Sequence, residues 1–204
     1  MDRKEHWQNI YTSKQLDEVS WYQPTPKTSL EQITKHCKDK NVAIIDVGGG
    51  DSFLVDNLLT LGYTNITVLD ISEAAINRAK ERLAEKANKV KWIVEDVTLF
   101  NPTEKYDYWH DRAVFHFLTD KKDVKSYLNL VNNTVNKNGK MTIATFSENG
   151  PKKCSGIEIQ QYSTESLTTT FNQHFKLVES FYIDHPTPFD TTQNFVFCTF
   201  EYLS

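Results

Sequence analysis

Acidic residues close several apolar runs of this 204-residue sequence, where a parallel sheet would present them to a ligand. Asp46 and Asp70 lie at the ends of two such runs, and Asp96 and Asp111 follow two later ones. In an open parallel sheet, ligands bind outside the carboxyl ends of the strands. A single aspartate at such a position is more often a turn or helix-capping residue. The prediction of a binding site therefore rests on the four acids together.

The spacing of Asp70 favours ribose binding. This residue lies twenty positions beyond Gly50, the separation expected between a glycine turn and an acid that accepts both ribose hydroxyls. Asp96 could accept a hydrogen bond from an adenine amino group. Ile71 and Val97, each of which follows an acid, could sandwich the flat base. Together these residues predict a nucleoside-binding site.

Three consecutive glycines, Gly48, Gly49 and Gly50, follow the apolar run 42–47 and precede a predicted helix. Glycine permits turns that other residues resist and lets a ligand approach the backbone closely. The dinucleotide fingerprint requires a further glycine at its sixth position, and Phe53 stands there. The pattern indicates a nucleotide-binding crossover but weakens a diphosphate-binding interpretation. A plain α/β turn without a ligand is the alternative.

A second group of residues could act on a substrate. His110, Asp111 and Arg112 leave the fourth predicted strand, and His185 lies in the last long loop. A histidine or an aspartate there could serve as a base, whereas Arg112 could pair with an acid or hold an anionic substrate. His116 stands between two phenylalanines and is predicted to be a core histidine. The six histidines show no metal-ligand spacing, so no metal site is predicted.

Strand-like and helix-like segments alternate along the chain, which predicts a parallel sheet with helices on both faces. The last strand has no helix before it and is expected to be antiparallel. The predicted fold is therefore α/β, a doubly wound, Rossmann-like, seven-stranded sheet with the last strand antiparallel. The strands are expected at residues 42–47, 66–70, 90–94, 106–110, 140–146, 175–183 and 195–202, and residues 149–161 are expected to be irregular.

Residues 1–39 are predicted to form an N-terminal aromatic arm and helix within a single domain that spans residues 1–204. Trp7 and Tyr11 are four positions apart and would share a helix face, whereas the prolines after Trp21 exclude a continuous helix. Ser29 and Gln32 have capping-box spacing. The arm could be packing alone, or it could be a lid whose aromatic residues, Trp21 foremost, cover a bound cofactor.

Composition restricts the class of protein. The net charge of −4 argues against nucleic acid as a main partner because phosphate binding needs a basic face. The first residues have no apolar core, so no secretory signal is expected, and no apolar run is long enough to span a bilayer. Three distant cysteines, Cys37, Cys154 and Cys198, suit a reducing compartment. A cytoplasmic, monomeric protein without a membrane partner is predicted.

With these motifs in place, residues 40–204 resemble the class I S-adenosylmethionine-dependent methyltransferases. The resemblance implies that Asp46, Gly48, Gly49 and Gly50 hold the methionine end of S-adenosyl-L-methionine. It further implies that Asp70 holds the ribose and that Ile71, Asp96 and Val97 hold the adenine. Trp21 and His110 complete the predicted cofactor contacts, and His110, Asp111, Arg112 and His185 are the predicted catalytic residues. Phe53 is ordinary in this family, whose cofactor has no diphosphate.

A finer resemblance is to a bacterial branch of these enzymes, carried by His6-Trp7, residues 20–23, Asp111-Arg112-Ala113 and residues 154–156. The Asp111-Arg112-Ala113 step is also similar to thiopurine and tellurite methyltransferases and departs from the acid-lysine-glycine step of eukaryotic lysine methyltransferases. The implied function is methyl transfer to a small-molecule nucleophile. Protein lysine N-methylation is the alternative, and a non-catalytic nucleotide-binding Rossmann-like module is a more distant one. A nicotinamide oxidoreductase would need the missing sixth-position glycine.

Overall fold

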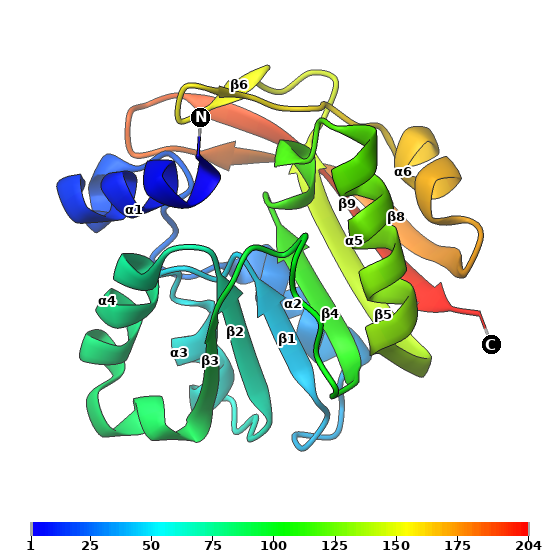
Figure 1. Ribbon diagram of the computed structural model, residues 1–204, viewed down its shortest axis with the longest axis horizontal. Helices are drawn as coiled ribbons and strands as arrows, with labels where there is room; N and C mark the ends of the chain where they lie inside the picture. Colours follow the sequence, from blue (N-terminus) through cyan, green and yellow to red (C-terminus); the bar gives the residue numbers. More distant parts are fainter. Residues whose placement is uncertain (1, 204) are drawn as a thin grey trace.

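The computed structural model describes residues 2–203, which form one seven-stranded sheet flanked by helices (Figure 1). The helices are α1 (Arg3–Ser13), η1 (Leu16–Glu18), α2 (Lys27–His36), α3 (Leu54–Thr60), α4 (Glu73–Leu83), η2 (Ala84–Lys89), η3 (Phe115–Phe117), α5 (Lys121–Thr134) and α6 (Thr164–Phe171). The strands are β1 (Ile44–Val47), β2 (Ile66–Asp70), β3 (Val90–Val94), β4 (Tyr106–Arg112), β5 (Val135–Phe146), β6 (Lys153–Cys154), β7 (Ile157–Glu158), β8 (Phe175–Pro186) and β9 (Thr192–Tyr202).

The sheet has the order β3-β2-β1-β4-β5-β9-β8. The pairs among β1 to β5 are parallel, and β9 is antiparallel to both of its neighbours, β5 and β8. The predicted doubly wound, seven-stranded sheet with an antiparallel last strand is confirmed. The carboxyl ends of β1, β2 and β4 meet at one edge, and α1 lies across that edge (Figure 1).

Alternation along the buried strands builds a core on each face of the sheet. On β1, Ile44 packs with α2, α3 and α4 residues, whereas its neighbour Ile45 packs with α5 and α6 residues such as Tyr127 and Phe171. Successive side chains of a strand point to opposite faces. Because helices cover both faces of the sheet here, both residues are fully buried. A buried strand of this kind reads as a continuous apolar run, as residues 42–47 do.

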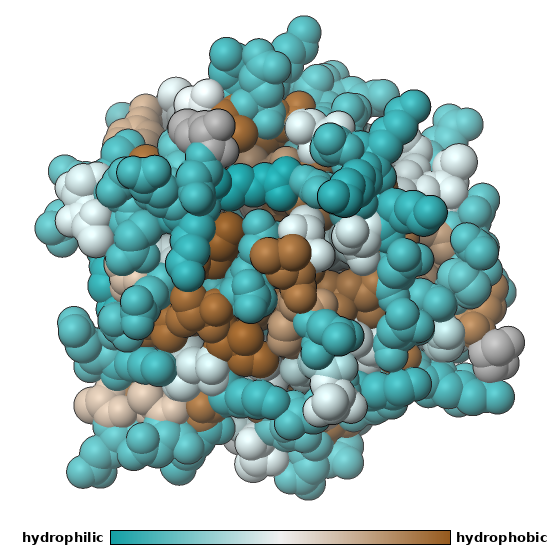
Figure 2. Space-filling model, viewed as in Figure 1, coloured by the Kyte–Doolittle hydropathy of each residue, from teal (hydrophilic) through white to brown (hydrophobic). Residues whose placement is uncertain are grey.

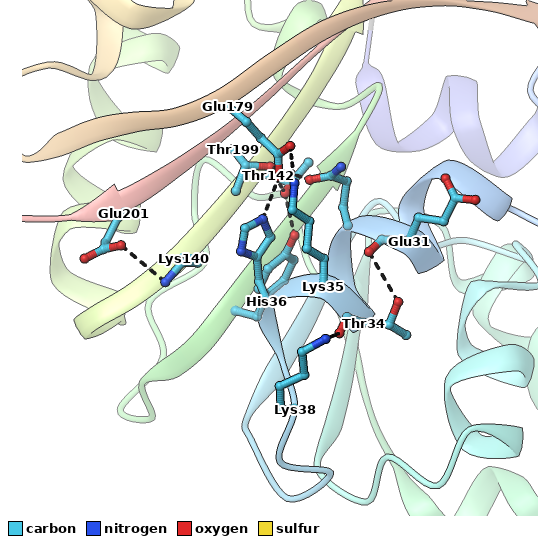
Figure 3. A network of polar contacts seen from close by, with 12 residues as sticks. Glu31, Thr34, Lys35, His36, Lys38, Lys140, Thr142, Glu179, Thr199 and Glu201 are labelled. Carbon is cyan, nitrogen blue, oxygen red and sulfur yellow. Dashed lines mark hydrogen bonds and ion pairs between the residues drawn. The ribbon is translucent and has the colours of Figure 1, made fainter.

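Polar contacts attach α2 to the distal half of the sheet. Glu179 on β8 accepts hydrogen bonds from Lys35 at 2.6 Å and from His36 at 2.8 Å (Figure 3). Deeper in the same interface, Thr199 of β9 donates to Gln32 at 3.0 Å. These contacts fix α2 against strands that lie far away in the sequence.

Replacing Glu179 by glutamine is expected to lower the free energy of unfolding by about 1 kcal/mol at neutral pH. Partial burial opposes ionisation, but the hydrogen bonds from Lys35 and His36 hold the pKa of Glu179 below its usual value. A lowered pKa contributes stability above the unfolded-state value, and this contribution disappears as the pH falls through the folded-state value. Urea unfolding should therefore separate the two proteins at pH 7 and let them converge in acid.

Glu158→Gln is the matched control because its ion pair with Lys153 is exposed. It should change stability little at any pH. If Glu179→Gln stayed less stable than the unmodified protein by the same amount in acid, the charge of Glu179 would not be the cause of the lost stability.

Some predicted boundaries were wrong. The capping box at Ser29 does not form, because α2 begins at Lys27 and Ser29 is buried within it. Helix α5 ends at Thr134 and β5 begins at once, so Gly139 lies within a strand. The segment predicted to be irregular contains the short β6–β7 hairpin, and β8 and β9 extend into the predicted loop between them, so His185 belongs to a strand.

The N-terminal arm is anchored on α4. Gln8 accepts hydrogen bonds from the Ser72 hydroxyl and the Ala74 N–H, both at 3.1 Å, and Arg78 donates to the Tyr11 carbonyl at 3.0 Å. Trp7 and Tyr11 share a face of α1, as predicted, and both lie close to the Trp21 ring. The arm is thereby held over the carboxyl edge of the sheet. Within residues 2–203, none of the helices combines the length and apolar character needed to cross a membrane.

The molecular face in Figure 2 is mostly hydrophilic, with hydrophobic residues grouped over β3 and the segment that follows it. Val94 at the end of β3 is partly exposed and Leu99 is largely exposed. Val97 lies between them in the sequence but is buried and faces the cavity described below. The segment after β3 thus presents apolar side chains both outward and toward the cavity.

Candidate active site

A large cavity opens at the carboxyl edge of the sheet, beneath the arm. It encloses about 1340 Å³ of space free of atoms, open solvent at its mouth included. Of the residues predicted to bind the cofactor, all but Gly50 line this cavity. The lining members are Trp21, Asp46, Gly48, Gly49, Asp70, Ile71, Asp96, Val97 and His110. The fold therefore brings together residues predicted from five separate segments.

The glycine turn after β1 needs glycine for two different reasons. Gly48 and Gly50 have φ angles of +65° and +50°, in the left-handed region that side chains disfavour. At Gly49, an added Cβ would lie 2.6 Å from Asp46 Oδ2 and 2.8 Å from Val68 Cγ1. Gly50 does not line the cavity, but a Cβ added there would lie 3.2 Å from Asp70 Oδ2. The turn thus keeps its backbone close to both acids.

Asp70 ends β2 and is buried in the cavity wall. Its carboxylate accepts the Ser72 N–H at 2.8 Å. Burial, and to a smaller degree the charges of Asp51 and Asp46, raise the pKa of Asp70 to about 7. The group is therefore ready to exchange its proton near neutral pH, and a hydrogen-bond donor bound in the cavity would favour its ionised form.

Asp96 lies at the far end of the cavity, beyond β3. Its Oδ1 accepts from the Thr98 N–H at 2.8 Å and the Thr98 hydroxyl at 2.7 Å. Arg3 Nη1 lies 3.9 Å from Oδ2. Ile71 and Val97 line the same part of the cavity. A fixed acid with two apolar side chains in the same part of the cavity suits a flat base with an exocyclic amino group.

His110 belongs to a buried hydrogen-bond chain. A carboxylate only accepts, so the ring Nδ1–H donates to Asp46 Oδ1 at 2.7 Å, and Nε2 accepts from the Ser29 hydroxyl at 2.9 Å. His110 lines the cavity, but both ring nitrogens are engaged. Its geometry suits orienting Asp46 rather than removing a proton from a substrate.

Asp111 does not line the cavity, and its predicted catalytic role is not supported by its position. It is fully buried on the opposite face of β4, where it accepts from the Val114 N–H at 2.9 Å, the Phe115 N–H at 3.3 Å and the Tyr127 hydroxyl at 2.5 Å. Burial, only partly offset by these donors, raises the pKa of Asp111 to about 6. The residue holds the turn after β4 against α5.

Asp111→Asn should therefore reduce stability rather than ligand binding. The amide would present donors where the Tyr127 hydroxyl now donates, and we expect a loss of about 2 kcal/mol in the free energy of unfolding. The urea midpoint should fall while the affinity for S-adenosylhomocysteine stays within a few-fold. In the double variant with Tyr127→Phe, the two losses should be less than additive. If Asp111→Asn instead had normal stability and no turnover, Asp111 would have to take part in the reaction.

Arg112 lines the cavity next to β9. Its Nη1 donates to the Trp21 carbonyl at 3.4 Å, and its guanidinium carbon lies 5.2 Å from the centre of the Phe195 ring. Nη2 is buried without a hydrogen-bond partner among residues 2–203. Burial lowers the pKa of Arg112 to about 10, so the group stays positively charged at neutral pH.

His185 lies outside the cavity lining and fastens the arm instead. Its Nε2–H donates to the Ser20 carbonyl at 2.8 Å, and Nδ1 accepts from Gln23 Nε2 at 3.2 Å. Burial and the charge of Arg112 lower the pKa of His185, which favours the neutral ring that this pattern needs. The observed contacts of His185 are structural, and its predicted catalytic role stays a prediction.

The remaining titratable candidates are also unsuited to proton transfer. His116 is fully buried, as predicted for a core histidine, and accepts the Phe146 N–H at 3.2 Å. Burial lowers the pKa of His116 to about 3. Cys154 does line the cavity, but burial raises the pKa of its thiol to about 11. It therefore remains a protonated, unreactive thiol at neutral pH.

Sequence reasoning missed one side of the cavity. The side chains there come from the turn after β4 and from the ends of β5 and β9, and include Phe117, Phe146, Gln193 and Phe195. Ser29 was also missed as a lining residue. Phe195 and Phe197 are two positions apart on β9 and so share one face of the strand. No sequence signal marked that Phe195 and not Phe197 would line the cavity.

Comparisons with known proteins agree on the family. A family model described as methyltransferase domain matches residues 38–184. The chain is 31% identical over 148 residues to malonyl-[acyl-carrier protein] O-methyltransferase 1 of Ilyobacter polytropus, covering 72% of this chain and 53% of that protein. It thus spans about half the length of that relative. It is also 24% identical over 205 residues to EEF1A lysine methyltransferase 2 of Danio rerio, covering 91% of this chain and 78% of the relative.

Among solved structures, the chain superposes on the N-methyltransferase NodS from Bradyrhizobium japonicum WM9 in complex with S-adenosyl-L-homocysteine. The TM-score is 0.75 at 14% identity, with 100% of both chains covered. At this identity the similarity establishes the fold alone. The finer resemblance to thiopurine and tellurite methyltransferases stays a prediction, as do the monomeric state and the cytoplasmic location.

Proposed function

The chain belongs to the class I S-adenosylmethionine-dependent methyltransferases, and we propose that it methylates a small-molecule nucleophile at the cavity beneath the arm. The named relatives act on different classes of acceptor, an acyl-carrier-protein conjugate and a protein lysine among them. The acceptor class must therefore be argued from this chain's own cavity.

The residues present fit the family's cofactor. The buried Asp70 carboxylate would accept the ribose hydroxyls, and Asp96 with Ile71 and Val97 would hold the adenine. The turn of Gly48 and Gly49 would leave room for the methionine end. A side chain at Gly49 would clash with Asp46, so only glycine keeps the turn this close to that carboxylate. When bound, S-adenosylmethionine would supply a sulfonium methyl group: an acceptor lone pair forms a bond to the methyl carbon, and the electron pair of the broken S–C bond returns to sulfur, which leaves as S-adenosylhomocysteine.

The cavity suits a positively charged ligand. Asp46, Asp51 and Asp70 contribute carboxylates to its wall, and the rings of Trp7 and Trp21 cover it. Aromatic faces attract cations within about 6 Å. The chain's own contribution would be to bind, orient and exclude water, because both nitrogens of His110 are occupied and Asp111 lies outside the cavity. Catalysis by positioning therefore fits better than catalysis by a protein base.

One observation carries the small-molecule assignment: the arm encloses the part of the cavity where an acceptor would bind. Trp21 and Tyr22 of the arm line it together with Phe146, Cys154 and Phe195. An extended protein segment would need an open groove, whereas a small molecule can be enclosed. Protein lysine methylation is the second candidate, favoured by the match to the EEF1A lysine methyltransferase over most of the chain.

The deciding experiment incubates the full-length protein with methyl-labelled S-adenosylmethionine and a lysate separated into small-molecule and protein fractions. Label in the small-molecule fraction supports the proposal. Label confined to the protein fraction, at lysine, would replace it with the second candidate. Cofactor binding without transfer to either fraction would favour a non-catalytic module.

His185→Ala should weaken cofactor binding by roughly fivefold to tenfold, because the arm would lose two hydrogen bonds worth about 1 kcal/mol in combination. Calorimetry with S-adenosylhomocysteine measures the affinity, and limited proteolysis near residues 14–25 should show a more accessible arm. His174→Ala, whose ring stacks on Tyr202 away from the cavity, is the control. Unchanged affinity with a loosened arm would mean that the arm is packing and not a lid.

A further inference from the structure

Among residues 2–203, the Arg112 guanidinium is a buried cation without an acidic partner. The chain has four arginines, and the other three each pair with an aspartate: Arg3 with Asp123, Arg78 with Asp51 and Arg82 with Asp56. No ion pair among residues 2–203 includes Arg112. Its Nη2 is buried and unbonded. Burying an unpaired charge is unfavourable, and an anionic ligand would offset that cost.

The guanidinium of Arg112 lies toward β9, within electrostatic reach of Asp46 on the cofactor side of the cavity. Arg112 pairs with Ala144 of β5, and its guanidinium lies 5.2 Å from the Phe195 ring of β9. The glycine turn follows β1, on the other side of β4. The free Nη2 therefore belongs to the side of the cavity formed by β5, β9 and Trp21, where the acceptor would bind.

We propose that Arg112 anchors a carboxylate of the methyl acceptor, so that the substrate is a small apolar or aromatic molecule bearing one carboxylate. This inference rests on the proposed small-molecule function. A guanidinium presents two parallel N–H donors that match a carboxylate. The Phe117, Phe146 and Phe195 side chains around it would contact the apolar body of the same molecule.

The charge balance favours a carboxylate over a phosphate. Among the described residues that line the cavity, the arginines are Arg3 and Arg112, and no lysine takes part. Arg3 is already paired with Asp123 and lies near Asp96, at the opposite end. A single guanidinium neutralises one negative charge, whereas a phosphate dianion would leave a second one among aromatic side chains.

The test uses full-length protein labelled with ¹⁵N-arginine and saturated with S-adenosylhomocysteine, whose binding is measured first. Acetate, benzoate, benzamide and inorganic phosphate are then titrated while the Arg112 Nε resonance is followed. Acetate and benzoate should shift this resonance, with benzoate binding more tightly, and benzamide should not. Arg112→Gln should weaken benzoate binding by at least about tenfold, as expected for a lost charged hydrogen bond, and leave S-adenosylhomocysteine affinity within threefold.

Controls separate this inference from its rivals. Arg3→Gln, which changes a paired arginine in the same cavity, should leave benzoate binding unchanged. Arg112→Lys keeps the positive charge and should retain part of the benzoate binding.

Three results would overturn the carboxylate assignment or its place in the cavity. No response to acetate or benzoate, or tighter binding of phosphate than of benzoate, would overturn the carboxylate assignment. So would an Arg112→Gln protein that binds S-adenosylhomocysteine at least tenfold less tightly but 5′-methylthioadenosine normally, because Arg112 would then hold the cofactor's own carboxylate. Failure to bind S-adenosylhomocysteine at all would instead contradict the proposed function.

Discussion

Asp70→Asn is expected to weaken binding of S-adenosylhomocysteine by roughly tenfold to a hundredfold, the effect of losing hydrogen bonds to a charged group. The Asp70 carboxylate is buried at the end of β2 and already accepts the Ser72 N–H. In asparagine, an amide nitrogen would face either that donor or the ribose hydroxyls. Calorimetry on the full-length protein measures the change.

The same residue should make cofactor binding depend on pH. Because burial raises the pKa of Asp70 to about 7, the protein without cofactor holds a growing fraction of the neutral acid as the pH falls below that value. Ribose hydroxyls donate best to the ionised form, so affinity should decline in mild acid and level off above neutrality. 5′-Methylthioadenosine is the suitable probe because it carries no amino acid group that titrates in this range.

Two comparisons give this prediction its control. Asp70→Asn should bind 5′-methylthioadenosine weakly and lose the decline in affinity on the acid side of about pH 7. Asp39→Asn, in the exposed turn before β1, should bind 5′-methylthioadenosine as tightly as the unmodified protein does at every pH. A pH profile that survives in Asp70→Asn would assign the titration to another group.

Gly49→Ala is expected to abolish measurable cofactor binding, although it adds a single methyl group. The new Cβ would lie 2.6 Å from Asp46 Oδ2 and 2.8 Å from Val68 Cγ1, distances at which atoms must move apart. Asp46 is held by His110, which is in turn held by Ser29. Displacing the carboxylate would therefore disturb the cavity wall as well as the turn. Overpacking of this kind costs about 1–3 kcal/mol in stability.

The control for Gly49→Ala must separate loss of the site from loss of stability. Gly62 has a φ of +87° and open space where a Cβ would lie, so Gly62→Ala should cost about 1 kcal/mol through backbone strain alone. It should keep normal cofactor affinity while its unfolding midpoint falls. If Gly49→Ala retained affinity within threefold, the close approach at the turn would not matter for the ligand.

The sequence alone determined the order of strands and helices and the cofactor side of the cavity. Strand, glycine turn and helix are encoded locally, so β2 and β3 were predicted with their observed bounds. The separation of Gly50 and Asp70 could be counted along the chain. Because parallel strands bring their carboxyl ends to one edge, acids that close several runs had to meet there. Cofactor contacts predicted from such strand ends, such as Asp46 and Asp70, line the observed cavity.

Only the tertiary structure decided which of the predicted catalytic residues face the cavity. His110, Asp111 and Arg112 are consecutive, but neighbouring side chains on a strand point to opposite faces. Which face held the cavity depended on α1 and the arm packing over one side and α5 over the other. Asp111 therefore bonds to Tyr127 of α5, while Arg112 reaches Phe195 across β5.

The N-terminal arm shows most clearly what could not be predicted from the sequence. Its aromatic residues were visible in the sequence, but neither its docking on α4 nor its attachment to His185 was. The Ser20 and His185 positions are 165 residues apart, and no local pattern of residues encodes a contact of that range. Contacts between distant segments depend on where the whole sheet places them, so only the assembled fold showed that His185 fastens a cover and that Arg112 stands unpaired beneath it.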